Sequence, residues 1–216
     1  MTTSLVDTAA RTTTRNLLRC GIAAGPLFVG ITAIHVLTRE GFDLRRHPIS
    51  LLSVGGPGWV QILTFAVSGV LVVAFAVGLR RVLHPGRAGT FGPLLIGLFG
   101  LGLIAGGVFV ADPALGFPPG TPDGIPETVS WHAAVHNVAP IVAFNALIIV
   151  TFVFARRFAG QREWGWFAYS MATGLVCLGL AIWPGIDGIS VRLAVMVTLG
   201  FAWTTALAAR LADKPV

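Results

Sequence analysis

Two histidines four residues apart, His132 and His136, stand at the start of a long apolar segment. In a helix, side chains four residues apart project from the same face, so both imidazoles would point the same way. Imidazole is the usual acid–base group near neutral pH and the commonest metal ligand in proteins. The pair lacks the glutamate of the H-E-x-x-H motif, which rules out that class of zinc protease.

Other polar residues are predicted at the same depth as this pair. Asp112 follows the third apolar segment, and His35 lies about one turn before the end of the first. In such a polar layer Asp112 would be a general acid or a metal ligand. His132 and His136 would be bases or ligands, with His35 assisting. A cofactor held by this layer would be a divalent metal on His132, His136 and Asp112. The residues expected to contact a substrate are His47, Gln61, Arg45 and Trp131.

Three interpretations of this layer stay open: a structural hydrogen-bonded cluster, an acid–base or metal site, and a proton relay or transport path. Ionisable groups at membrane depth are costly and usually face the protein interior or a water-filled cavity, which favours a function. The outer interface of a membrane is wet and tolerates histidine, which favours a structural role.

The composition places these residues in a membrane protein. The chain has 216 residues, of which 55% are hydrophobic and 11% charged, whereas soluble domains carry about 25% charged residues. That shortage excludes a soluble globular domain, and the mean hydropathy of +0.81 excludes a disordered chain. The net charge of +6 does not indicate a nucleic-acid partner, because the basic residues lie beside apolar runs and form no stripe.

Six apolar segments are long enough to cross a bilayer, which takes roughly 20 residues. They predict an all-α, polytopic membrane bundle of six transmembrane helices in a single domain over residues 18–211. The rest is an N-terminal tail at 1–17, a C-terminal tail at 212–216, and outer loops at about 39–58, 112–130 and 184–190. The expected spans are 20–38, 59–79, 91–111, 131–154, 166–183 and 191–209.

Small residues indicate where these helices pack closely. Gly21 and Gly25 form one G-x-x-x-G step. Gly102 and Gly106 form another, and such steps suit helix contacts in lipid. Asn145 lies on the opposite side of its helix from the histidine pair, so we expect it to bond a neighbouring helix.

Lys and Arg residues in short loops set the expected orientation. Eleven of the fifteen lie in the two termini and in the second and fourth loops, which predicts that both termini are cytoplasmic. The other side carries six of the nine acidic residues and four of the five histidines. We therefore expect a multi-pass protein of the cytoplasmic membrane whose chemistry-bearing residues lie on its outer side.

The first outer loop contains an apolar stretch, Ile49 to Val54, that is far too short to cross a membrane. It could be a lid that dips back into the protein or simple interfacial packing, and both interpretations stay open. The second outer loop, 112–130, is stiffened by prolines and glycines without requiring helix or strand.

Several motifs together resemble a known family. They are His47-Pro48-Ile49-Ser50-Leu51-Leu52-Ser53, Gly58-Trp59-Val60-Gln61, Asp112-Pro113, Phe117-Pro118-Pro119-Gly120 and the His132/His136 pair. From about residue 18 to 209 the chain resembles the bacterial and archaeal membrane family known as domain of unknown function 998. The resemblance implies a six-helix integral membrane protein, as the hydropathy does independently. It implies no established activity.

Two functions compete. The first is a membrane enzyme that uses the outer His/Asp layer on a lipid or isoprenoid substrate, which enters sideways from the outer leaflet for acid–base cyclisation or hydrolysis. The second is a non-catalytic membrane protein that assembles with a partner, binds lipid or transports a small solute. Transport is disfavoured, because the second, third and fifth spans contain no charged residue. Membrane lipids and a hydrophobic small molecule are the expected partners.

Overall fold

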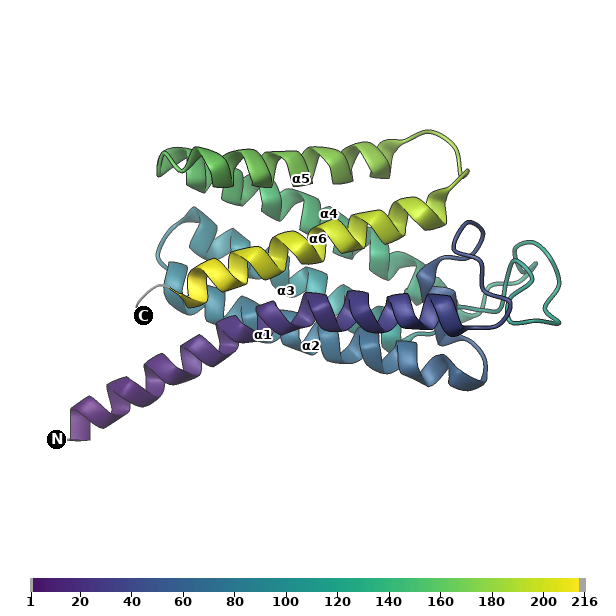
Figure 1. Ribbon diagram of the computed structural model, residues 1–216, viewed down its shortest axis with the longest axis horizontal. Coiled ribbons are helices and arrows are strands. Elements are labelled where there is room, and N and C mark those ends of the chain that lie inside the picture. The colour runs from purple at the N-terminus through teal and green to yellow at the C-terminus, as the bar shows by residue number, and fades with distance from the viewer. Residues whose placement is uncertain (1, 214–216) are drawn as a thin grey trace.

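The computed structural model describes residues 2–213 as a bundle of six long helices (Figure 1). Two short 3-10 helices, η1 (Ile49–Ser53) and η2 (Gly56–Gly58), lie between the first two. Each long helix contains a stretch long and apolar enough to cross a membrane, so the predicted all-helical bundle of six transmembrane helices is confirmed. Residues 214–216 of the expected C-terminal tail lie outside the described residues. The long helices are α1 (Thr2–Thr38), α2 (Trp59–Leu83), α3 (Arg87–Val108), α4 (Trp131–Gly160), α5 (Trp164–Ile182) and α6 (Ile189–Ala212).

Most helix ends differ from the expected spans by one to six residues, and two differences bear on the site and the tail. α1 begins at Thr2, so residues 2–17 of the expected tail continue the first helix, and its first turns project beyond the bundle (Figure 1). α3 ends at Val108, so the end expected at residue 111 is wrong. The apolar run continues past Val108, but Phe109 has an extended backbone and the next carbonyls bond side chains of α4.

Consecutive helices pack against each other, and α1 also packs on α6, which closes the bundle. The two described chain ends lie at one end of the bundle, which we call the terminal end (Figure 1). The connections 39–58 and 109–130 lie at the opposite end, which we call the long-loop end. Most of the polar candidates from the sequence belong to this long-loop end.

Aromatic side chains fill the centre of the bundle. Phe28 and Phe201 are buried and stack with their ring centroids 4.9 Å apart. Trp203 is fully buried and donates its indole N–H to the hydroxyl of Ser170 at 3.0 Å. This bond ties α6 to α5 within the apolar region, where an unpaired N–H group would be costly.

Three of the four glycines in the predicted G-x-x-x-G steps lie at close helix contacts. Gly25 lies where α1 touches α6, and Gly21 lies where α1 meets both α2 and α6; at each, an added Cβ atom would force its neighbours to shift. In the second step, a Cβ atom on Gly102 would lie 2.7 Å from the Cβ atom of Ala143 in α4. Gly106 differs, because a Cβ atom there would meet its nearest neighbour at an ordinary 3.8 Å.

The expected bond from Asn145 to a neighbouring helix is wrong. Its amide donates to the carbonyl oxygen of Ile141, one turn earlier in α4, at 2.8 Å. An asparagine side chain can reach its own helix backbone in this way, so it needs no partner on another helix.

The apolar stretch of the first long loop folds back onto the helices. It forms η1, in which Leu51 and Leu52 are only 4% and 0% exposed. Of the two interpretations that the sequence left open, this burial supports the lid. η1 packs on α1 and α2 and covers the long-loop end of the bundle.

Candidate functional site

Asp112 and Ser130 tie the start of α4 to the chain that leaves α3. Ser130 is the N-cap of α4, and its hydroxyl oxygen accepts from the N–H of Ala133 at 3.2 Å. The Asp112 carboxylate accepts from the Ser130 N–H at 2.8 Å and from the Ser130 hydroxyl at 2.7 Å. Asp112 therefore braces an N-cap, where serine satisfies an otherwise unpaired N–H group of the first helical turn.

These bonds favour the ionised form of Asp112. The Ser130 hydroxyl, and then the Ser130 N–H, hold the pKa of the Asp112 carboxyl below its ordinary value, with a smaller contribution from His132. A carboxylate stabilised in this way accepts hydrogen bonds but has no proton to give near neutral pH. The geometry therefore weighs against Asp112 as a general acid.

His132 and His136 share a helix face, as their spacing predicts, and both bond the chain that leaves α3. The Nδ1 atom of His132 lies 2.8 Å from the carbonyl oxygen of Val110, and that of His136 lies 2.7 Å from the carbonyl oxygen of Phe109. A carbonyl oxygen only accepts, so each Nδ1 atom carries a hydrogen and donates it. Two adjacent carbonyls beyond the end of α3 are thereby satisfied.

The expected metal ligands do not converge. Asp112 turns both carboxylate oxygens to Ser130, and both histidines direct Nδ1 to backbone carbonyls. Within residues 2–213, no three side chains of His, Cys, Asp or Glu form a group that could hold a metal ion. The residues therefore do not fit the divalent metal considered from the sequence. At Asp112 and His132 they form a hydrogen-bonded structural cluster.

Two other candidates lie at the edge of this cluster or away from it. Trp131 is 72% exposed, and its ring packs edge-on against that of His132 with centroids 5.8 Å apart. Arg45 is exposed in the first long loop, where its backbone N–H donates to the carboxylate of Asp43 at 2.9 Å. Neither side chain is brought to the histidine pair by a polar contact.

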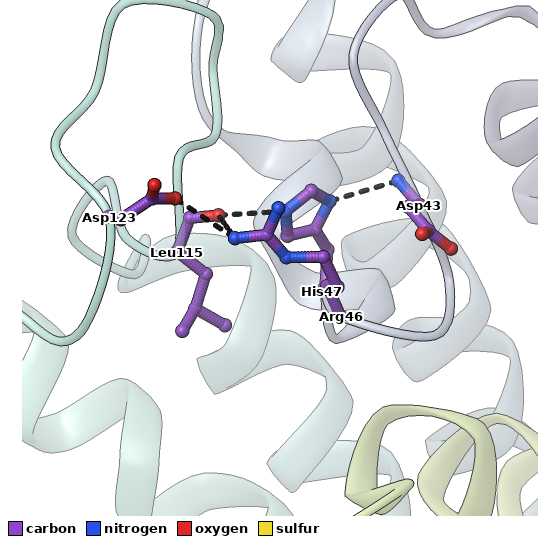
Figure 2. Close-up of polar contacts among 5 residues, drawn as sticks. All are labelled: Asp43, Arg46, His47, Leu115 and Asp123. Atoms are coloured by element: carbon purple, nitrogen blue, oxygen red, sulfur yellow. Dashed lines mark hydrogen bonds and ion pairs between the residues drawn. The ribbon is translucent and has the colours of Figure 1, made fainter.

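His47 joins the two long loops (Figure 2). Its Nε2 atom donates to the carbonyl oxygen of Leu115 at 3.0 Å, and its Nδ1 atom accepts from the N–H of Asp43 at 2.9 Å. Beside it, the exposed Arg46 forms an ion pair with Asp123 at 2.9 Å. We call these contacts the loop clamp. Because the buried His47 ring uses both nitrogens within the protein, its geometry supports a structural role rather than substrate binding.

A cavity of about 90 Å³, which we call the chamber, lies between the helices beneath η1. Its walls are almost wholly apolar, and His136 is the one titratable side chain among the described residues that line it. With Nδ1 bound to Phe109, the polar atom that His136 can offer the chamber is Nε2, which has a lone pair in the neutral ring. The chamber draws its walls from five of the six long helices and from the start of η1.

A groove of about 260 Å³ runs between α1 and α6. We call it the α1–α6 groove. It shares Phe28, Ile49 and Val197 with the wall of the chamber. These three side chains therefore form the partition between the chamber and the surface of the bundle.

His35 and Gln61 lie together between α1 and α2, apart from the histidine pair. The Gln61 amide donates to the hydroxyl of Thr32 at 3.1 Å, and His35 lies one turn beyond Thr32 on the same face of α1. The Gln61 Oε1 atom and both ring nitrogens of His35 are nevertheless buried without a hydrogen bond of acceptable geometry among the described residues. The polar layer predicted from depth is thus two groups, one between α3 and α4 and one between α1 and α2.

The sequence reasoning missed Ser130 and the wall of the chamber. The N-cap role of Ser130 could have been predicted, because a serine directly before a helical segment is a usual N-cap. Phe28 and Val197 carry no such signal, because an apolar residue that lines a cavity looks the same in sequence as one in a packed core.

Comparison with known proteins bears on the family. Residues 22–210 match the family described as "Protein of unknown function (DUF998)". No curated protein and no solved structure matches the chain. The family match spans part of every long helix and both long loops, including the motifs around His47, Asp112 and His132. The chain therefore belongs to the DUF998 family.

Proposed function

We propose that this multi-pass membrane protein binds the apolar end of a lipid-derived molecule in the chamber, which the molecule reaches through the α1–α6 groove. The observation that carries this proposal is the shared partition: Phe28, Ile49 and Val197 border the chamber and the groove. Both spaces are lined mainly by apolar side chains, which suits a hydrocarbon chain.

The sizes of the two spaces support a ligand that is only partly enclosed. Sites for small molecules usually measure about 300–1,000 Å³. A chamber of about 90 Å³ can take the end of such a molecule, and the groove of about 260 Å³ can take more of it. Because the groove lies between two membrane-length helices, the ligand would come from the surrounding lipid.

The charge distribution supports an outer-leaflet site. Basic residues gather in the loops at the terminal end, which favours a cytoplasmic location for that end. The chamber lies toward the long-loop end, beneath η1. The ligand would therefore enter from the outer leaflet of the cytoplasmic membrane.

A catalytic version of this proposal rests on His136. Its Nδ1–H donates to the carbonyl oxygen of Phe109, which fixes one tautomer, and the residue lines the chamber. A base with a lone pair on Nε2 in an apolar site is suited to acid–base chemistry on a lipid or isoprenoid group. In this version Asp112 and His132 hold the start of α4 in place and take no part in proton transfer.

The substitution Val197→Phe tests ligand binding, with Val195→Phe as its control. Val197 is 5% exposed and borders both spaces, whereas Val195 lies on the same helix and is 41% exposed. We expect native mass spectrometry to show a retained lipid-derived molecule in the wild type and in Val195→Phe, and its loss in Val197→Phe. Equal retention by three folded proteins, or no retained molecule in the wild type, contradicts the proposal.

The substitution His136→Asn separates catalysis from binding. Asparagine can still donate to the Phe109 carbonyl from near the position of Nδ1, but it has no counterpart of Nε2. If His136 is a base, the variant retains substrate where the wild type retains product, so the extracted molecules differ in chromatographic retention and fragmentation, and also in mass if the step is a hydrolysis. The same molecule in both proteins contradicts the catalytic version and leaves ligand binding in place.

A further inference from the structure

Buried polar atoms without partners gather at the long-loop ends of α1 and α2. Among the described side chains, five such atoms lie there: both ring nitrogens of His35, Nη1 of Arg39, Oγ of Ser53 and Oε1 of Gln61. His35, Ser53 and Gln61 are 7%, 4% and 0% exposed. Each unpaired buried polar atom is destabilising, so five in one place indicate a polar ligand.

Helix spacing and hydrogen bonds to neighbouring residues place these four residues in one group, which we call the polar cluster. The Nη2 atom of Arg39 donates to the carbonyl oxygen of Val54, the residue after Ser53, at 2.5 Å. His35 stands one turn before Arg39 on the same face of α1, and Gln61 bonds Thr32, which stands one turn before His35. The polar cluster therefore lies where the end of α1, the end of η1 and the start of α2 meet.

The polar cluster carries a positive charge that no described acidic side chain pairs with. Of the two ion pairs among the described residues, one belongs to the loop clamp and the other joins Arg210 to Glu163. The Arg39 guanidinium instead lies over the ring of Phe117, 5.3 Å from its centroid. Arg39 is partly buried, and its described neighbours are the Phe117 ring and the Val54 carbonyl oxygen, neither of which carries a negative charge. Such a cation favours an anionic ligand.

The polar cluster lies beyond the chamber along one face of α1. Arg39 continues the helical bonding of α1, because its N–H donates to the carbonyl oxygen of His35 at 3.0 Å. At 3.6 residues per turn, Arg39 is only about 20° around the helix from Phe28 and stands about 10 Å beyond Thr32. Phe28 and Thr32 both line the α1–α6 groove, and Thr32 also accepts the bond from Gln61.

We propose that the ligand is an acidic amphiphile, whose carboxylate or phosphate head is bound by the polar cluster while its chain lies in the groove and the chamber. The Nη1 atom of Arg39, the Ser53 hydroxyl and a ring N–H of His35 donate to the anionic oxygens. This inference rests on the proposed function, because its chain site is the chamber. It adds the chemical class of the head group.

Decanoic acid and decanol test the head group, because they share a chain and differ in charge. Each is titrated by calorimetry into the wild-type protein in phosphatidylcholine nanodiscs, at about pH 8, where a carboxyl group is ionised. We expect decanoate to bind about tenfold more tightly than decanol. Decyl phosphate tests a phosphate head on the same chain, and inorganic phosphate tests a free anion.

The substitution Arg39→Gln removes the cation, with Arg81→Gln as its control. Arg81 is exposed at the terminal end, so its loss changes the net charge equally without touching the polar cluster. We expect Arg39→Gln to lower the decanoate affinity to that of decanol, and Arg81→Gln to leave it unchanged. An equal loss in both variants shows a general charge effect and contradicts the proposal.

The substitution Ser53→Ala keeps the proposal testable if Arg39→Gln fails to fold. It deletes a buried hydroxyl that has no partner among the described residues, so the ligand-free protein should keep or gain thermal stability. Its affinity for decanoate should fall several-fold while that for decanol stays the same.

The outcomes separate this inference from the proposed function. Equal wild-type affinity for decanoate, decyl phosphate and decanol contradicts the acidic head but leaves the chamber as a chain site. Binding of none of the amphiphiles contradicts the proposed function as well. Binding of inorganic phosphate without either acidic amphiphile shows a free-anion site and also overturns the inference.

Discussion

His132 and His136 each donate to a carbonyl oxygen of the chain that leaves α3. Their common helix face could be predicted from the sequence, because helix geometry is local. Their partners could not, because Val110 and Phe109 lie 22 and 27 residues earlier in the chain and meet α4 only in the folded bundle. The same separation explains why Asp112, expected among the chemical groups, proves to brace the N-cap.

Because of Asp112, the stability of the folded protein should decrease as the pH is lowered. Its pKa is lowered in the folded protein because Ser130 donates to the ionised carboxylate. The unfolded chain therefore binds the proton more readily, so the stabilisation is complete above the unfolded pKa of about 3.9 and is lost as the pH falls through the folded pKa. We expect the unfolding midpoint of the detergent-purified wild type to fall as the pH is lowered from about 5 toward 3.

The substitution Asp112→Asn tests this pH dependence. The neutral amide accepts more weakly than the carboxylate, so at neutral pH the midpoint should fall by about 2–4 °C. As the pH is lowered, the unfolding midpoint of Asp112→Asn should fall less steeply than that of the wild type. Asp187→Asn, at an exposed site before α6, is the control and should behave as the wild type. Identical acid profiles for the wild type and Asp112→Asn would contradict the assignment.

At the scale of the elements, hydropathy marks the parts of helices that can cross a membrane, whereas hydrogen bonds decide where helices end. α3 stops at Val108 although its apolar run continues, because side chains of α4 satisfy the next carbonyls. α1 extends to Thr2 because its polar first turns continue the helix outside the apolar run. Neither boundary is visible in a count of apolar residues.

Gly102 and Gly106 form a matched pair for testing helix contact. A Cβ atom on Gly102 would lie 2.7 Å from the Cβ atom of Ala143 and 3.1 Å from the carbonyl oxygen of Ala139, so α4 would have to move. We expect Gly102→Ala to reduce the free energy of unfolding by about 1–3 kcal/mol. Gly106→Ala meets only ordinary contacts and should be neutral or gain up to about 1 kcal/mol from helix propensity.

Unfolding of the two glycine variants in detergent, followed by circular dichroism, measures this difference. Equal losses in both variants would show that α3 and α4 do not approach each other at Gly102 as described.

For the molecule as a whole, the number and approximate limits of the helices were predictable, because a membrane-length apolar run is a strong signal. The position of each residue along its apolar segment also predicted that His35, Gln61 and the histidine pair lie near one end of the bundle. That position does not show which helices are neighbours, so two separate polar groups were predicted as one layer. The chamber and its groove depend on the same helix pairing, which a single sequence does not contain.

The orientation of the whole molecule is a prediction from its basic loops. Thr128 is exposed at the long-loop end and His84 at the terminal end. In a background lacking Cys20 and Cys177, we expect a membrane-impermeant maleimide to label Thr128→Cys in intact cells and His84→Cys only after lysis. The reverse labelling pattern would show the opposite orientation in the membrane, with the chamber toward the inner leaflet.

The loop clamp also bears on how the chain assembles. It joins His47 to Leu115, 68 residues apart, and Arg46 to Asp123, 77 residues apart. Closing so long a span of chain costs entropy that only packed helices can offset. We therefore expect the clamp to form only after the first four helices have inserted and met. Protection of the His47 region from hydrogen exchange would time that step in the biogenesis of this protein.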